Sequence, residues 1–177
     1  MLKLVSCDRH EFTYTSLDNA AIQKKDLAKR FDVILIPDQD KNVIVDGKPK
    51  SEEGPGYFEP LPPPYTGGIG KDGVANLKAF VQAGGTLVCM SDACALALDE
   101  FNLPVRNLVG RMRSSGYSLP GTMVNLGVDT SQPLAGGMPK TCAAYCTSGP
   151  VFGTSVPGAG VGRAVVARLP EYADQVV

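Results

Sequence analysis

The sequence is poor in features that mark several protein classes: it has one histidine, no tryptophan and no long apolar run. His10 is the only imidazole available as a general base, the role that histidine fills most often in enzymes. No stretch of about 18 apolar residues occurs, which excludes a membrane-spanning helix. The N-terminal MLKLVSCDRHEF has too short an apolar segment for a signal peptide. We therefore expect a cytoplasmic chain without a membrane partner.

Charge of one sign is also lacking, because 17 basic residues nearly balance 18 acidic ones and leave a net charge of −1. A nucleic-acid partner is therefore not expected. The five cysteines are an odd number without a tight framework, which favours a reducing compartment over a disulfide scaffold. Cys7 with His10, and Cys142 with Cys146, fall short of a metal-ligand set. Neither a metal nor a cofactor is expected.

The length and composition predict one domain over residues 1–177. The length is typical of a single domain, and hydrophobic residues make up 44% of the sequence. The 20 glycines and 14 prolines fall in clusters. The most prominent cluster predicts a long loop over residues 39–70, and loops of that length are usually functional or mobile surface segments. Inside it, Val43–Val45 followed by Asp46-Gly47 can form a small hairpin.

The N-terminal half alternates between strand and helix patterns. Residues 12–17 alternate as a short strand would, and Asp18 or Asn19 can cap a helix over residues 20–30. The run DVILIPD, residues 32–38, is β-branched and apolar and ends at a proline. Such a run is typical of a central strand covered on both faces, as parallel sheets require.

A second helix and strand follow the long loop. In KDGVANLKAFVQAGG, residues 71–85, apolar side chains recur at helical spacing before a glycine pair that can end the helix. Thr86–Met90 is the next predicted strand and Asp92–Phe101 the next helix. This order predicts parallel strands joined by right-handed crossovers.

After Pro104 the pattern changes to short strands divided by glycine and proline. The segments are GTMVNLGVD, CAAYCTSGPVFGT and GRAVVARL. They predict an antiparallel or mixed extension at one side of the sheet.

Four dispersed segments carry a resemblance to a known family: RFDVILIPDQ, PPPYTGGIGKDGVANLKAFVQAGGTLV, LPVRNLV and VDTSQPLAGGMP. They resemble the class I glutamine-amidotransferase-like superfamily, and more narrowly the accessory domain that follows the peptidase domain in some bacterial zinc-carboxypeptidase-type proteins. The resemblance covers residues 11–168. It implies a flavodoxin-like fold, a three-layer α/β/α sandwich with a mainly parallel sheet. Full-length relatives can be exported, and their zinc peptidase activity does not carry over to this sequence.

The resemblance also implies a strand and a helix before the segment EFTYTSL, where this sequence has only ten residues. The usual first strand is therefore expected to be missing. An open sheet position exposes backbone donors and acceptors that proteins normally cover. We expect a homodimer or an exchanged strand to close it.

The same resemblance places Ser91 at the strand-to-helix turn where hydrolytic α/β folds carry a nucleophile. Ala93 fits the small neighbour that this turn needs, whereas Cys89 replaces the usual glycine. Ser91 itself stands where glutamine amidotransferases have cysteine. The alternative is that Ser91 and Asp92 cap the following helix, as serine and aspartate commonly do.

Cys94 is the other candidate nucleophile, because a helix N-terminus can lower the pKa of a thiol in its first turn. Buried packing is the alternative for Cys94 and the expected role of Cys89. A nucleophile needs a base, and the superfamily places its histidine late in the chain, where this sequence has none. The remaining candidate bases are His10, Asp92, Asp38 and Glu11.

Asp38 and Gln39 follow a predicted parallel strand at its carboxyl end, where open α/β sheets bind ligands. Together with Cys89 they are expected to wall a pocket beside Ser91, and a small-molecule ligand is possible there. The glycine-rich Thr66–Gly70 precedes a helix, as anion sites do, but lacks the spacing of a dinucleotide or phosphate loop. A structural turn is expected instead.

Two functions fit these observations. The first is a non-catalytic or vestigial amidotransferase-like domain that acts as a structural or binding module. The second is a small hydrolase that acts on an ester, amide or phosphoester through Cys94 or Ser91. The degenerate turn and the missing late histidine favour the first.

Overall fold

The structure is a computed structural model that describes residues 11–48, 66–109, 121–147, 149–154 and 162–169. Its contacts divide the chain into two compact units, residues 1–103 and 104–177. The single domain over residues 1–177 stays a prediction, because contact units of this size can belong to one folding domain. Among the described residues, no helix has the length and apolar character needed to cross a bilayer.

A pair of parallel strands is the centre of the first unit. Strand β1 (Val33–Ile36) pairs with β2 (Thr86–Cys89) in parallel, from Val33 opposite Thr86 to Ile36 opposite Cys89. Both strands and their parallel pairing agree with the sequence prediction. Burial of β1 alternates, however, because Ile34 and Ile36 are buried while Val33 is 56% exposed. The prediction of a strand covered on both faces is therefore wrong for the described residues.

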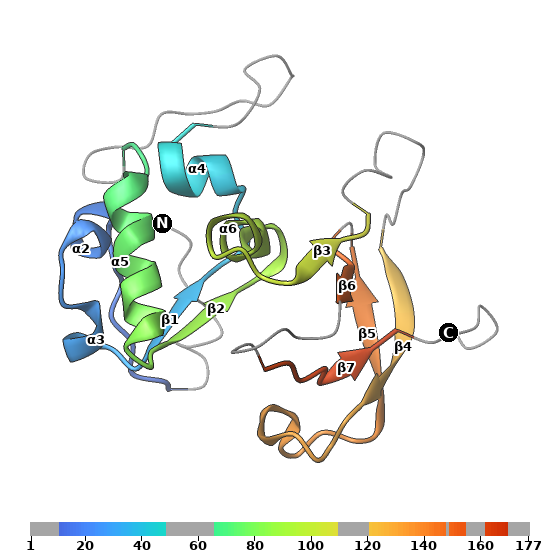
Figure 1. The fold of residues 1–177 in the computed structure, drawn as a ribbon. Helices are drawn as coiled ribbons and strands as arrows, with labels where there is room; N and C mark the ends of the chain where they lie inside the picture. The colour runs from blue at the N-terminus through green and yellow to red at the C-terminus, as the bar shows by residue number, and fades with distance from the viewer. Residues whose placement is uncertain (1–10, 49–65, 110–120, 148, 155–161, 170–177) are drawn as a thin grey trace. The chain divides into compact units, whose positions relative to one another are not determined.

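Helix α5 (Gly70–Gln82) connects the two strands and lies alongside them in Figure 1. It ends as its glycine pair predicts, with Gly84 in the left-handed region at φ 98°. The Gly84 amide donates to Val81 O and the Gly85 amide to Phe80 O, both at 3.0 Å. This 6→1 and 5→2 pattern is a Schellman motif. A Cβ on Gly85 would overlap the Phe80 ring, so glycine also allows the chain to turn closely against the helix.

The single helix predicted over residues 20–30 is two short helices. Asp18 caps α2 (Asn19–Gln23) by accepting from the Ala21 amide at 2.6 Å, and α3 (Leu27–Arg30) follows after Asp26 at φ 84°. The break has a tertiary cause. Asn76 Nδ2 of α5 donates to the carbonyl oxygens of Ile22 and Gln23 at 3.1 and 2.7 Å. These carbonyls are thereby satisfied by another helix, and α2 ends there.

Two further predictions near the strands are wrong. Residues 12–17 form no strand, because no described neighbour pairs with them. The expected hairpin at Val43–Val45 is instead α4 (Lys41–Asp46), capped by Asp40 and ended by Gly47 at φ 73°. Asp46-Gly47 is a turn signal for hairpins and equally a helix end, since both need a residue at positive φ. The rest of the predicted loop, residues 49–65, lies outside the described residues.

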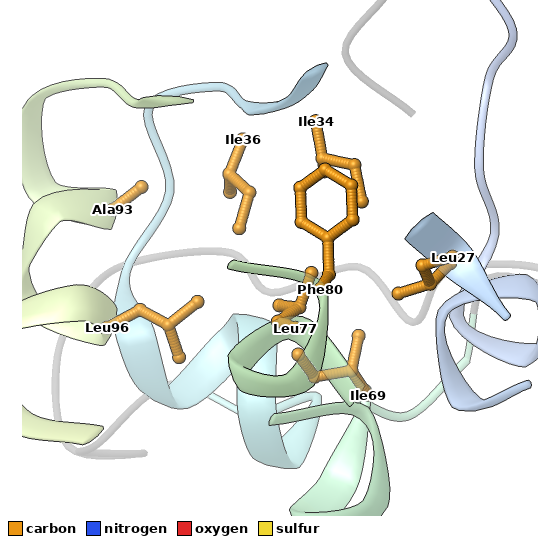
Figure 2. Packing of buried hydrophobic residues seen from close by; sticks show 8 residues of the cluster. All are labelled: Leu27, Ile34, Ile36, Ile69, Leu77, Phe80, Ala93 and Leu96. Carbon is orange, nitrogen blue, oxygen red and sulfur yellow. The ribbon is translucent and has the colours of Figure 1, made fainter. Parts of the chain in front are cut away.

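The described residues of the first unit share a buried apolar core (Figure 2). Figure 2 shows side chains from β1, α5 and the neighbouring segments converging on the Phe80 ring and Leu77. Phe80, Leu77 and Leu96 are the largest fully buried side chains. Burial of this kind is the main stabilising term for such a small sheet. The buried members of the cluster are Leu27, Ile34, Ile36, Ile69, Leu77, Phe80, Ala93 and Leu96.

The second unit contains two small antiparallel sheets. Strands β3 (Val105–Asn107) and β6 (Phe152–Thr154) form one pair. Strand β4 (Thr122–Val128) is central in the other, between β5 (Thr141–Cys146) and β7 (Ala167–Arg168). The antiparallel strands agree with the prediction. An extension at one side of the parallel sheet is not seen, since the described strands form separate sheets.

The fold class is therefore mixed α/β, with one parallel strand pair and two antiparallel sheets. The described residues do not form a clear three-layer sandwich, because β1 and β2 are the only strands of their sheet there. In a three-layer sandwich both faces of β1 would be covered, whereas the face that carries Val33 is exposed.

Candidate functional site

The strand-to-helix turn after β2 has strained backbone geometry. Met90 is still extended, at φ −104° and ψ 137°, and Ser91 follows at φ 48°. The chain then forms a 3-10 turn, η1 (Ser91–Ala93), and helix α6 (Cys94–Glu100). A serine at positive φ is uncommon, and a strained nucleophile turn in α/β hydrolases is one setting in which such residues occur. A positive φ at Ser91 agrees with such a turn, and the role of Ser91 as a nucleophile stays a prediction.

Ser91 and Asp92 lie inside the first turn, η1, and not at the cap positions of the two helices. Those positions are held by Met90 for η1 and Ala93 for α6, and neither makes a side-chain capping bond. The capping role of Ser91 and Asp92 stays a prediction.

Asp38 contacts the turn from the neighbouring strand. Its Oδ1 accepts a hydrogen bond from the Asp92 amide at 3.1 Å. Asp38 follows β1 as Ser91 follows β2, and parallel strands end at the same edge of a sheet, so the two segments meet there. Gln39, the other expected pocket residue, lines a different cavity, the groove beside β1 described below.

The two cysteines of the turn interact with each other rather than with a base. Cys94 Sγ donates to the carbonyl oxygen of Cys89 at 3.2 Å. Burial, followed by the charges of Asp38 and Asp92, raises the pKa of Cys94. Burial and the neighbouring Cys94 raise the pKa of Cys89 to about 11. The expectation of a lowered pKa at Cys94 is therefore wrong: both thiols are protonated at neutral pH.

The structure brings no histidine to the turn among the residues it describes. His10 and Cys7 lie outside the described residues, and Glu11, at φ 57°, is exposed. Cys142 and Cys146 lie on β5 and share one face of that strand, as expected from their spacing. Within the described part of the chain, no three histidine, cysteine or acidic side chains are close enough to hold a metal ion.

An ion-pair cluster near the turn could not be read from the sequence. Lys41 Nζ lies 2.9 Å from Asp99 Oδ2 and 3.0 Å from Glu100 Oε1, and so joins α4 to the end of α6. The hydrogen bond to Asp99 raises the pKa of Lys41. Acidic residues at a helix C-terminus are unfavourable with the helix dipole, which is the one signal that a cation was needed there.

A groove beside β1 was also not predicted from the sequence. Its volume is about 840 Å³. Its lining includes Phe12–Asn19 and residues 30–37, which contain all of β1, together with residues of α4 and of the segment 66–69. All of its lining residues lie in the first unit, and none of them belongs to the Ser91 turn.

Thr66–Gly70 acts as a structural turn. Ile69 donates its amide to Ile44 O at 2.8 Å, and Asn19 Nδ2 donates to Gly67 O at 2.9 Å. A Cβ on Gly68 would overlap the Val45 carbonyl. Glycine is needed there because the chain passes directly against α4.

No protein-family model, curated protein or solved structure matches this chain. The amidotransferase-like resemblance therefore depends on the sequence segments alone.

Proposed function

We propose that the chain is a non-catalytic amidotransferase-like module of flavodoxin-like type, with a structural or binding role. The observation that carries this proposal is the hydrogen bond from the Asp92 amide to Asp38 Oδ1, 3.1 Å long. Asp92 is the residue after Ser91, and in a working nucleophile turn the amide of that residue belongs to the oxyanion hole.

A carboxylate on this amide opposes acyl transfer in two ways. The donor is already engaged, so a developing oxyanion would have to displace Asp38 before it could be stabilised. The carboxylate also places negative charge where further negative charge must form, and like charges at such short range repel strongly. An oxyanion hole needs donors and positive potential, and this turn presents an acceptor.

The thiols support the same conclusion. A cysteine nucleophile reacts as the thiolate, and burial together with Asp38 and Asp92 raises the pKa of Cys94. Cys89, with a pKa raised to about 11, is still further from ionisation at neutral pH. Neither thiol has an imidazole partner among the described residues.

A hydrolase that uses Ser91 is the second candidate, and one observation favours it. Ser91 has φ 48°, and backbone strain at a non-glycine residue is often kept where function requires it. In this proposal a base would have to come from a segment that carries His10, or from a carboxylate.

The test is an assay of the full chain on a panel of activated esters and phosphoesters. We expect wild type, Ser91→Ala, Cys94→Ala and His10→Ala to show the same background rates. A rate at least tenfold lower in Ser91→Ala or Cys94→Ala would refute the non-catalytic proposal in favour of the hydrolase.

Asp38→Ala sharpens this assay, because it frees the Asp92 amide and keeps both Ser91 and Cys94. It also removes one of the charges that raise the pKa of Cys94, so any gain is assigned to Ser91 only through the double variant. We expect its rates to stay at background, since the missing base is not restored. Turnover that appears in Asp38→Ala and disappears in Asp38→Ala/Ser91→Ala would mean that the turn is competent and only blocked. A Lys71→Ala variant on the exposed surface of α5 is the matched control for purification artefacts.

A further inference from the structure

A small pocket lies in the second unit, at one end of the three-stranded sheet in which β4 is central between β5 and β7 (Figure 1). Its volume is about 280 Å³. Ligand pockets usually hold about 300–1,000 Å³, so this one suits a small molecule or one functional group of a larger molecule. Its described lining consists of Gly127, Val128, Asp129, Lys140, Val165 and Arg168.

Gly127 leaves an unfilled position beside Arg168. The two residues are directly opposite each other in the antiparallel β4–β7 ladder, and such residues share one face of the sheet. A Cβ on Gly127 would meet no described atom within 4 Å, and the residue does not have a positive φ. Neither a close contact nor the backbone conformation therefore requires glycine at this position. The missing side chain leaves room for a ligand next to Arg168.

The carboxylate in the lining is already engaged by the loop between β4 and β5. Asp129 Oδ1 accepts hydrogen bonds from the Ser131 amide and hydroxyl at 3.1 and 2.6 Å, and Oδ2 accepts one from Gln132 Nε2 at 3.2 Å. These hydrogen bonds and, less strongly, the charge of Arg168 lower the pKa of Asp129. The carboxylate is therefore ionised at neutral pH and holds the loop.

The two cations of the lining have no comparable partners. Within the part of the chain that the structure describes, neither Lys140 Nζ nor the Arg168 guanidinium donates a hydrogen bond or forms an ion pair. Two backbone donors of the lining are used, since the Val128 amide donates to Lys140 O and the Asp129 amide to Val166 O, both at 2.8 Å. Lys140 and Arg168 are thus the charged donors that the lining offers to a ligand.

We propose that this pocket binds one oxyanion group of a small molecule, a carboxylate or a phosphate, through the side chains of Arg168 and Lys140 beside Gly127. A guanidinium presents parallel N–H donors that match two oxygens of either group. Asp129 reduces the charge of the lining to one net positive charge, so a single oxyanion group matches it better than a polyanion does. The inference concerns the second unit and does not depend on the role of the Ser91 turn.

The test is an NMR titration of the isotope-labelled full chain with inorganic phosphate and, separately, with acetate at constant ionic strength. We expect saturable shifts of the Gly127 and Arg168 amides with at least one of the two anions. Saturation by phosphate alone assigns a phosphate ligand, and saturation by acetate alone assigns a carboxylate. Saturation by both supports a site for the geometry that the two groups share.

Two variants test the residues that carry the proposal. Arg168→Gln keeps a polar side chain and removes the charge, so the dissociation constant should increase by about tenfold or more. Gly127→Val fills the unfilled position with a residue that strands favour. It should weaken binding by a similar factor without lowering the melting temperature. Arg106→Gln, on the exposed part of β3 and outside the pocket lining, is the matched control and should bind like wild type.

The absence of a saturable shift with both anions would overturn the proposal. Equal dissociation constants in wild type and Arg168→Gln would also overturn it, as would an equal loss of affinity in Arg106→Gln, which would indicate unspecific attraction of anions to the surface. If Gly127→Val does not fold, Lys140→Gln replaces it, because Lys140 is exposed and its removal should also weaken binding. Unchanged affinity in Lys140→Gln would exclude the two-cation site.

Discussion

At the scale of single residues, Asp38 contacts the turn and adds negative charge to it. Its Oδ1 lies 3.1 Å from the Asp92 amide, and its negative charge is one of the causes that raise the pKa of Cys94, after burial. A thiol with a raised pKa has less thiolate at a given pH and reacts more slowly with electrophiles. Removing the charge should therefore increase the thiolate fraction.

We expect Asp38→Asn to increase the alkylation rate of Cys94 by about threefold at pH 8, because an exposed charge pair at short range contributes less than about 1 kcal/mol. The sign follows from the raised pKa, which falls when a neighbouring negative charge is removed. Peptide mapping with a thiol reagent measures the rate at each cysteine. Asp72→Asn, a surface carboxylate on α5, is the control and should leave the rate unchanged. A slower Cys94 in Asp38→Asn would contradict this account.

The sequence predicted where single residues lie in the chain's elements better than it predicted their hydrogen bonds and pKa values. The sequence placed Ser91 in a turn after a strand and Asp38 beside it, because strand and helix patterns locate the ends of elements. It could not predict that the Asp92 amide donates to Asp38, or that burial together with two carboxylates raises the pKa of Cys94. Those properties depend on distances between segments more than fifty residues apart.

At the scale of elements, the local sequence pattern predicted helices and strands correctly where tertiary packing agrees with local propensity. Helix α5 and strands β1 and β2 follow their periodicity, and the Schellman end of α5 follows its glycine pair. Prediction failed where a tertiary contact decides. The split between α2 and α3 comes from hydrogen bonds of Asn76, a residue of α5. The local sequence around residues 20–30 does not include Asn76 and so cannot predict this split.

Helices α4 and α6 are joined by the ion pairs of Lys41. Its side chain is 24% exposed, whereas that of Asp99 is 60% exposed, so solvent screens the interaction on one side. We expect Lys41→Met to lower the free energy of unfolding by about 0.5–1 kcal/mol at pH 7, measured by urea denaturation. Lys29→Met, which removes an exposed pair with Asp26 at 3.3 Å, should change it by less than about 0.5 kcal/mol.

The Lys41 contribution should also depend on pH. The hydrogen bond to Asp99 raises the pKa of Lys41 above its ordinary value of 10.5. A raised pKa in the folded state stabilises the protein below the unfolded pKa, and this stabilisation is lost as the pH rises through the folded value. The difference between wild type and Lys41→Met should therefore be constant from pH 7 to 9 and decrease above pH 10.5. A difference that grows at high pH would contradict the ion-pair explanation.

At the scale of the whole molecule, buried apolar surface is distributed unevenly between the two contact units. The buried cluster around Phe80 and Leu77 belongs entirely to residues 1–103. The buried hydrophobic residues described in the second unit are smaller: Val109, Val124, Val128 and Ala135. Because burial of large side chains is the main favourable term in folding, most of the stabilising core among the described residues lies in the first unit.

We therefore expect a fragment of residues 1–103 to unfold cooperatively by itself, and a fragment of residues 104–177 to lack a cooperative transition. Thermal unfolding followed by circular dichroism measures both. Phe80→Ala in the first fragment tests whether its transition depends on the described core, since loss of a buried phenylalanine costs about 3–5 kcal/mol and should abolish or strongly lower the melting temperature. A broad, non-cooperative melt of residues 1–103 together with a single sharp transition of the full chain would instead show that both units fold as one domain, as the length of the sequence predicts.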